Sequence, residues 1–72
     1  MEKIKKIKIK VNGKITTIVD KLTLAELIKD LKIPLKKVAI ELNKEIVNKK
    51  RINKIEFKNN DVIEVVHFIG GG

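Results

Sequence analysis

Apolar residues and lysines alternate near the start of the chain. Ile7, Ile9 and Val11 are separated by Lys8 and Lys10. A period of two is typical of a strand with one buried and one solvent-facing side, because successive side chains point to opposite faces of a sheet. The pattern therefore predicts a strand whose lysines face water.

The residues that follow predict a return strand and hence a hairpin. Asn12-Gly13 tolerates the positive φ angles of a type I′ turn, and residues 14–19 are rich in β-branched side chains. A two-residue turn determines which side chains face each other across the two strands. The expected facing pairs are Val11 with Lys14, Ile9 with Thr16, and Ile7 with Ile18.

One helix is predicted after the hairpin. Thr23 has the side chain of an N-cap, and Glu26, three residues later, can reach back to the Thr23 backbone. Apolar residues then recur at helical spacing, which predicts one face packed on the core, and Pro34 prevents further helix. The expected core stripe consists of Leu24, Leu27, Ile28 and Leu31.

The second half of the chain predicts further strands. Residues 38–42 alternate, and residues 62–68 are almost continuously apolar, as in a strand at the middle of a sheet. For residues 48–60 we expect irregular structure with at most one short edge strand. This order of elements predicts an α+β fold of the ubiquitin-like β-grasp class, a mixed sheet of four or five strands packed on one helix. We expect the domain to span residues 1–69, followed by a flexible glycine tail at residues 70–72.

The composition argues against several kinds of site. The chain has no cysteine and one histidine, which disfavours a thiol nucleophile, a disulfide framework and a metal centre. Nothing resembles a nucleotide-binding loop or a catalytic dyad, so we expect neither enzymatic activity nor a permanently bound cofactor. The apolar runs are far shorter than the roughly 18 residues of a membrane helix, and no hydrophobic leader is visible. A cytoplasmic protein without membrane contact is therefore expected.

A net charge of +8 raises the question of nucleic-acid binding. Arg51 is the only arginine among the 17 basic residues, and Phe57 and Phe68 are the only aromatic residues. The side chains for bidentate base readout and for base stacking are thus scarce. We interpret the lysines as a solvated surface that can steer the chain toward an acidic partner.

Three glycines, Gly70, Gly71 and Gly72, stand together at the end of the chain. Since glycine has no Cβ, an extended glycine tail fits a channel too narrow for other residues, and its terminal carboxylate is presented without steric cover. Attack of the Gly72 carboxylate on the α-phosphate of ATP would give an acyl adenylate. A sulfur donor could then displace AMP and leave a thiocarboxylate. Because the chain lacks a nucleotide-binding motif, a partner enzyme would have to bind the ATP.

Two stretches carry a resemblance to a known family. They are Ile40-Glu41-Leu42-Asn43, followed by Ile46-Val47, and the closing stretch from Asp61 to Gly72. They resemble the ThiS family, the sulfur carriers of thiazole formation in thiamin biosynthesis. The length, the early Asn-Gly hairpin and the single helix are similar as well.

The resemblance implies a function and a set of partners. Gly71 and Gly72 match the family's terminal diglycine, and Gly72 is the implied site of adenylation and thiocarboxylate formation. The implied partners are a ThiF-type adenylating enzyme, a sulfur donor protein and a ThiG-type thiazole synthase. Gly70, a third glycine, and the lead-in at residues 1–6 depart from the family pattern.

Other readings remain open at this point. A molybdopterin-synthase small subunit has the same fold, tail and adenylation chemistry, with a different acceptor, and another ubiquitin-like modifier is a related alternative. A basic RNA-binding β-grasp module is less favoured; its tail would be dispensable.

The last predicted strand supplies candidate docking residues. If Glu64 marks its outer face, Val62, Val66 and Phe68 share that face. Ordering a glycine tail costs backbone entropy, so affinity for partners should come largely from the folded surface. Exposed apolar side chains beside the tail would serve this purpose. His67 has no visible partner to set its pKa and is interpreted as structural.

Overall fold

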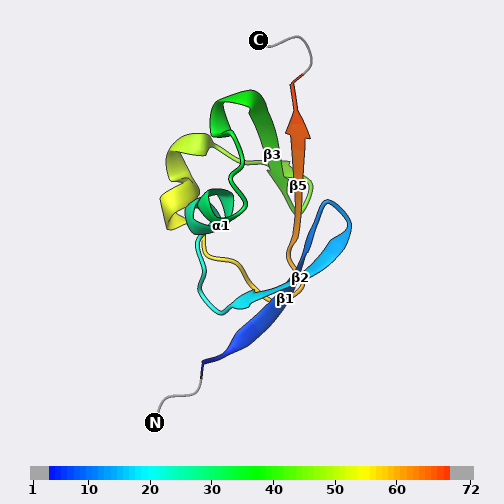
Figure 1. Ribbon diagram of the computed structural model, residues 1–72, viewed down its shortest axis with the longest axis vertical. Helices are drawn as coiled ribbons and strands as arrows, with labels where there is room; N and C mark the ends of the chain where they lie inside the picture. The colour runs from blue at the N-terminus through cyan, green and yellow to red at the C-terminus, as the bar shows by residue number, and fades with distance from the viewer. Residues whose placement is uncertain (1–3, 69–72) are drawn as a thin grey trace.

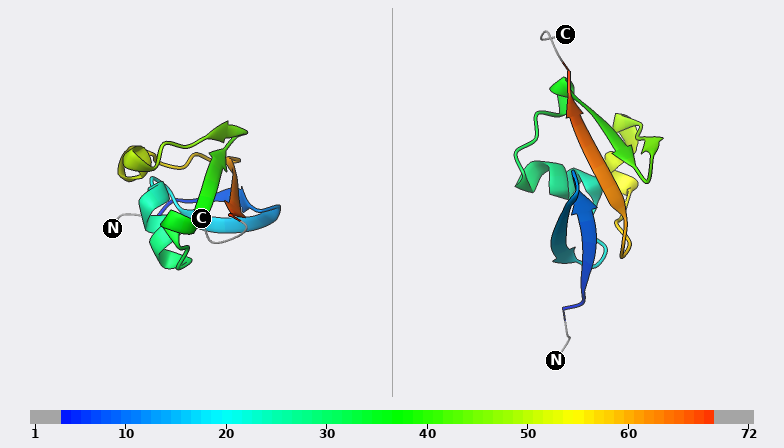
Figure 2. Two further views of the ribbon diagram at one scale, coloured as in Figure 1. Left: turned by 90° about the horizontal axis from the view of Figure 1, so that it is seen from above. Right: turned by 90° about the vertical axis from the view of Figure 1, so that its right-hand side faces the viewer.

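A computed structural model describes residues 4–68 of the chain. Five strands form one mixed sheet in the order β2-β1-β5-β3-β4. The helices lie on one side of the sheet, and no element within the described residues covers its other face (Figures 1 and 2). The predicted α+β, β-grasp-like arrangement is therefore confirmed. The elements are β1 (Lys6–Val11), β2 (Lys14–Val19), α1 (Leu24–Asp30), η1 (Leu35–Lys37), β3 (Val38–Leu42), β4 (Glu45–Ile46), η2 (Lys49–Lys54) and β5 (Val62–His67).

The hairpin of β1 and β2 has the predicted register, with Val11 opposite Lys14 and the expected pairs following in step. Asn12 and Gly13 have φ angles of +49° and +82°, as a type I′ turn requires. The inward-facing isoleucines of both strands are buried in the core. The alternating pattern therefore predicted both the strands and their buried face.

The central strand, β5, runs parallel to β1 and antiparallel to β3 (Figure 2). Its parallel pairing with β1 is short, since only two facing pairs, from Lys10 opposite Val62 to Val11 opposite Ile63, are made. Where β1 ends, the Asn12 side chain continues the ladder: its Oδ1 accepts a hydrogen bond from the Val65 N–H at 2.7 Å. One asparagine thus forms the hairpin turn and also holds the strand that leads to the C-terminus.

Helix α1 begins with the predicted capping box. The Glu26 N–H donates to Thr23 Oγ1 at 3.2 Å, and the Thr23 N–H donates to Glu26 Oε1 at 3.0 Å. The Glu26 carboxylate accepts hydrogen bonds from the Thr23 N–H and from the Thr23 hydroxyl, and these two bonds stabilise its charged form and lower the pKa of Glu26 below its usual value. The cap satisfies backbone donors that a seven-residue helix would otherwise leave without partners.

The prediction that Leu31 belongs to the core stripe is wrong. Leu24, Leu27 and Ile28 are buried, but Leu31 is 47% exposed. The helix ends at Asp30, and Leu31 is its C-cap. Beyond it the chain closes a Schellman turn, in which the Ile33 N–H donates to the Ile28 carbonyl and the Lys32 N–H donates to the Lys29 carbonyl. The chain therefore leaves the helical path before the fourth apolar position reaches the core.

Lys32 occupies the left-handed position of this turn, with φ +56°. Glycine adopts that conformation without the Cβ penalty of other residues. We expect Lys32→Gly to raise the free energy of unfolding by about 0.5–1 kcal/mol. Urea denaturation of the variant and of Lys32→Ala tests this, because alanine removes the lysine side chain but keeps the strained backbone. An equal gain in both variants would contradict the backbone explanation.

Residues 48–60 are more regular than predicted. Lys49–Lys54 forms the 3-10 helix η2, which begins where Asn48 Oδ1 accepts a hydrogen bond from the Lys50 N–H at 2.9 Å. Ile52 and Phe57 attach this segment to the core, since both are buried. In place of an edge strand, the segment makes one isolated bridge, from Glu56 to Thr23, and the short edge strand β4 lies earlier in the chain.

Candidate functional site

The uncovered face of β5 carries the predicted docking residues. Val62, Val66 and Phe68 are 37%, 57% and 50% exposed, whereas Ile63 and Val65 between them are 0% and 9% exposed. Their exposure follows from strand alternation, since the helices cover only the opposite face. The structure leaves all three predicted residues exposed, with Val62 and Val66 on the open face of β5 and Phe68 just past its end, and their role in docking stays a prediction.

Phe68 lies just past β5 and is held in two ways. Its N–H donates to the Lys37 carbonyl at 2.9 Å, and Lys49 Nζ lies over its ring, 5.3 Å from the centroid. A cation over an aromatic face is attracted by the ring's quadrupole. These contacts hold Phe68 beside the start of β3, while the residue stays 50% exposed.

The start of β5 is held by Asn43, in the turn between β3 and β4. Its Oδ1 accepts from the Val62 N–H at 2.9 Å, and its Nδ2 donates to Asp61 Oδ1 at 3.0 Å. Asp61 Oδ2 in turn accepts from the Lys58 N–H at 2.8 Å. Asn43 also adopts a left-handed conformation, with φ +52°. The Asn43 side chain therefore links the start of β5 to the turn that follows β3.

We expect Asn43→Ala to lower the free energy of unfolding by about 2 kcal/mol, because it removes both side-chain hydrogen bonds and leaves a strained backbone. Asn43→Gly should cost about 1 kcal/mol, since glycine relieves the strain but restores neither bond. Urea denaturation measures both values. Asn53→Ala is the matched control, as no side-chain hydrogen bond involving Asn53 occurs among residues 4–68. Equal losses at the two asparagines would contradict a special role for Asn43.

The glycine tail lies outside the described residues. This applies to Gly70, Gly71 and Gly72, so the predicted reactive carboxylate and the boundary at residue 69 stay predictions. Four residues follow Phe68 in the sequence. An extended segment of four residues spans at most about 14 Å.

The described part of the chain holds no cluster of three or more metal-ligating side chains. No helix within residues 4–68 is long and apolar enough to cross a membrane. His67, at the end of β5, is exposed.

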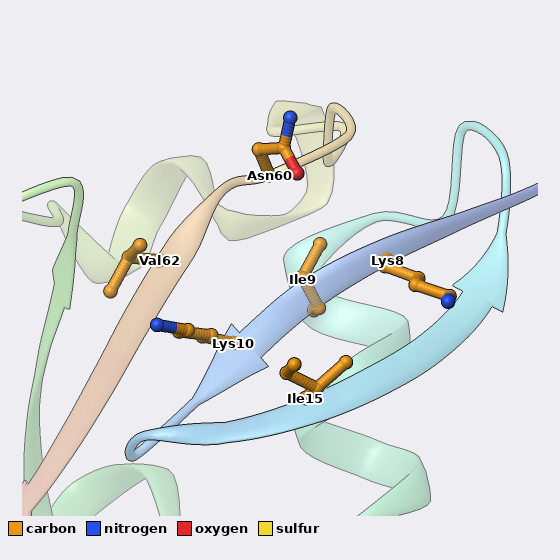
Figure 3. A pocket seen from close by; sticks show the side chains of 6 residues that line it. All are labelled: Lys8, Ile9, Lys10, Ile15, Asn60 and Val62. Atoms are coloured by element: carbon orange, nitrogen blue, oxygen red, sulfur yellow. The ribbon is translucent and has the colours of Figure 1, made fainter.

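Sequence reasoning missed one feature of the open face. A hollow of about 300 Å³ lies between β1, β2 and the start of β5 (Figure 3). Outward-facing Ile15 is 65% exposed there, although a polar residue was the simplest expectation for that side of the hairpin. The predicted register already placed Ile15 opposite Lys10, so the pairing was a usable signal. The hollow is lined by Lys8, Ile9, Lys10, Ile15, Asn60 and Val62.

Comparison with known proteins decides the family. The profile of the ThiS family matches residues 9–72. The chain belongs to the ThiS family. It is 44% identical over 50 residues to the sulfur carrier protein ThiS of Bacillus subtilis, an alignment that covers 69% of this chain and 76% of that protein.

Two further similarities concern ThiS-family structure and context. The crystal structure of the thiamine biosynthesis protein ThiS from Geobacter metallireducens superposes with a TM-score of 0.80 at 32% identity, covering 92% of this chain and 100% of that one. A thiazole synthase from Magnetococcus marinus is 44% identical over 50 residues, which are 69% of this chain but only 15% of that protein. A ThiS-like segment thus occurs within a much longer chain.

Proposed function

We propose that this ThiS-family sulfur carrier bears its sulfur as a thiocarboxylate on Gly72 and donates it to thiazole formation in thiamin biosynthesis. Carriage of sulfur rests on membership of the family, whose B. subtilis relative is a sulfur carrier protein. A carrier of this kind is a substrate and a donor, not an enzyme. The observation that supports the proposal best is that the chain leaves the central strand beside an exposed apolar surface and ends in three glycines.

The chemistry proceeds in two balanced steps. The Gly72 carboxylate attacks the α-phosphate of ATP and releases pyrophosphate, which gives an acyl adenylate. Sulfide delivered by a donor protein then attacks the acyl carbon and releases AMP, which leaves a thiocarboxylate. Oxide is a poor leaving group, whereas AMP is a good one, so the adenylate lowers the barrier to sulfur transfer.

The proposed partners follow from these steps. A ThiF-type adenylating enzyme binds and uses the ATP, so the carrier needs no permanently bound cofactor. A ThiG-type thiazole synthase receives the sulfur, and the ThiS-like segment within a thiazole synthase chain supports this pairing. We place the process in the cytoplasm, where ATP is supplied. Val62, Val66 and Phe68 are the proposed contact residues for these enzymes.

Intact-mass measurement tests the proposal directly. The full chain is incubated with ATP, a ThiF-type enzyme and a sulfur source, and we expect replacement of one oxygen by sulfur at the C-terminal residue. Omitting ATP is the control, because the carboxylate should then stay unmodified. Sulfur found elsewhere in the chain, or an unchanged mass with an enzyme that converts its own carrier, would refute the proposal.

A further inference from the structure

The hollow between β1, β2 and β5 has an apolar centre spread over three adjacent strands. Lys10 of β1 faces Ile15 of β2 on one side and Val62 of β5 on the other. Ile15 and Val62 are 65% and 37% exposed. Two apolar side chains therefore flank one lysine on the open face, and covering them would remove apolar surface from water.

Positive charge surrounds this apolar centre. In Figure 3 the side chains of Lys8 and Lys10 point in opposite directions, Lys10 toward Val62 and Lys8 toward β2, with Ile15 between them. None of the described residues that line the hollow is acidic. The carboxamide of Asn60 is the remaining polar group at the rim. A ligand here meets Ile15 with an ammonium group on either side, and it meets Val62 beyond Lys10.

We infer that the hollow binds an acidic segment of a partner protein, in which one apolar side chain is flanked by carboxylates. The apolar side chain would cover Ile15 and Val62, and the carboxylates would lie near the two ammonium groups. A small inorganic anion would leave the apolar centre exposed. A nucleic acid would find neither arginine nor an aromatic ring among the lining residues. The net charge of +8 extends the attraction to an acidic partner beyond direct contact.

The position of the hollow gives it a distinct role, which rests on the proposed function. Val62 and Phe68 are separated by six residues along β5, which corresponds to about 20 Å. A segment bound in the hollow therefore leaves Phe68 uncovered. A partner that binds the hollow can retain the carrier while the C-terminal residue passes from the adenylation site to the site of sulfur transfer. The hollow is thus a holding contact that includes Val62 and is separate from Val66 and Phe68.

Nuclear magnetic resonance titration of the uniformly 15N-labelled full chain tests this inference. The probe is a short peptide with blocked ends that carries one leucine between two pairs of aspartates. We expect its amide shift changes to concentrate at Lys8, Lys10, Ile15 and Val62. The double variant Lys8→Gln/Lys10→Gln should bind about tenfold more weakly, because both carboxylate partners are lost. Lys36→Gln, on η1, is the charge-matched control and should bind as the unmodified chain does.

Two peptide controls separate the contributions. Replacing the aspartates by asparagines should abolish binding, and replacing the leucine by glycine should weaken it, since both features of the hollow are required. Equal binding of the asparagine peptide, shift changes spread over lysines outside the hollow, or displacement of the peptide by an oligouridylate RNA would each overturn the inference. The intact-mass assay on the same samples keeps the tests apart: normal sulfur loading without peptide binding defeats this inference alone.

Discussion

Replacing the C-terminal carboxylate of Gly72 by a carboxamide is expected to abolish thiocarboxylate formation. The carboxamide retains the length of the tail and every side chain, but it lacks the anionic oxygen that attacks ATP. Semisynthesis provides this variant, and intact mass after incubation with the activating enzyme and ATP reads out the result. Because the chemistry is confined to one group, the loss should be complete. Residual sulfur incorporation at the normal rate would place the reactive group elsewhere.

Deletion of one of the three terminal glycines is the second test of the tail. Removing any one of Gly70, Gly71 and Gly72 gives the same chain, which still ends in two glycines. The single deletion therefore tests reach alone, since it shortens the tail by about 3.5 Å without changing its terminal chemistry. We expect at least a roughly 100-fold slower conversion, because reacting groups misplaced by even 1 Å can lose that much rate. Normal conversion of the shortened chain would show that the third glycine is not needed for reach.

Introducing a charge at the apolar surface beside the tail should weaken activation strongly. Val66 is 57% exposed at the end of the sheet where the chain leaves β5. Val66→Asp places a carboxylate where we expect a partner to exclude water, and a central contact of this kind is worth about 2 kcal/mol or more. The KM for the carrier in the adenylation reaction should rise by about 30-fold.

The matched control for this variant is Leu31→Asp. Leu31 is 47% exposed at the end of α1, away from the open face of the sheet. It tests whether any exposed apolar residue has the same effect. Both variants should unfold at similar urea concentrations, as each substitution is at a surface position. A similar KM for the two variants would remove Val66 from the docking surface.

Local patterns predicted most of the fold because each was decided by neighbouring residues. The Asn12-Gly13 turn specified the register of the hairpin, and Thr23 with Glu26 specified the start of the helix. The end of the helix was not predicted, since it depends on a left-handed lysine where the usual signal is glycine. The Asn12 and Asn43 contacts with β5 were also out of reach, because they join residues far apart in sequence.

The candidate site was also predicted only in part from the sequence. Alternation along β5 was sufficient to predict that Val62, Val66 and Phe68 are exposed, and all three are. Their role in docking stays a prediction. The hollow was missed because Lys8 and Lys10 were interpreted only as the wet side of a strand. Its apolar half comes from β2 and β5, and the parallel contact between β1 and β5 cannot be inferred from local pattern.

The parallel pairing of β1 with β5 also has a mechanical consequence. The strand nearest the N-terminus and the strand nearest the C-terminus lie side by side and run in the same direction. Force applied between the two ends of the chain therefore shears these strands along their length, so that their cross-strand bonds share the load and do not open one after another. The sheet should therefore resist force applied between its first and last strands better than an unzipping geometry would allow.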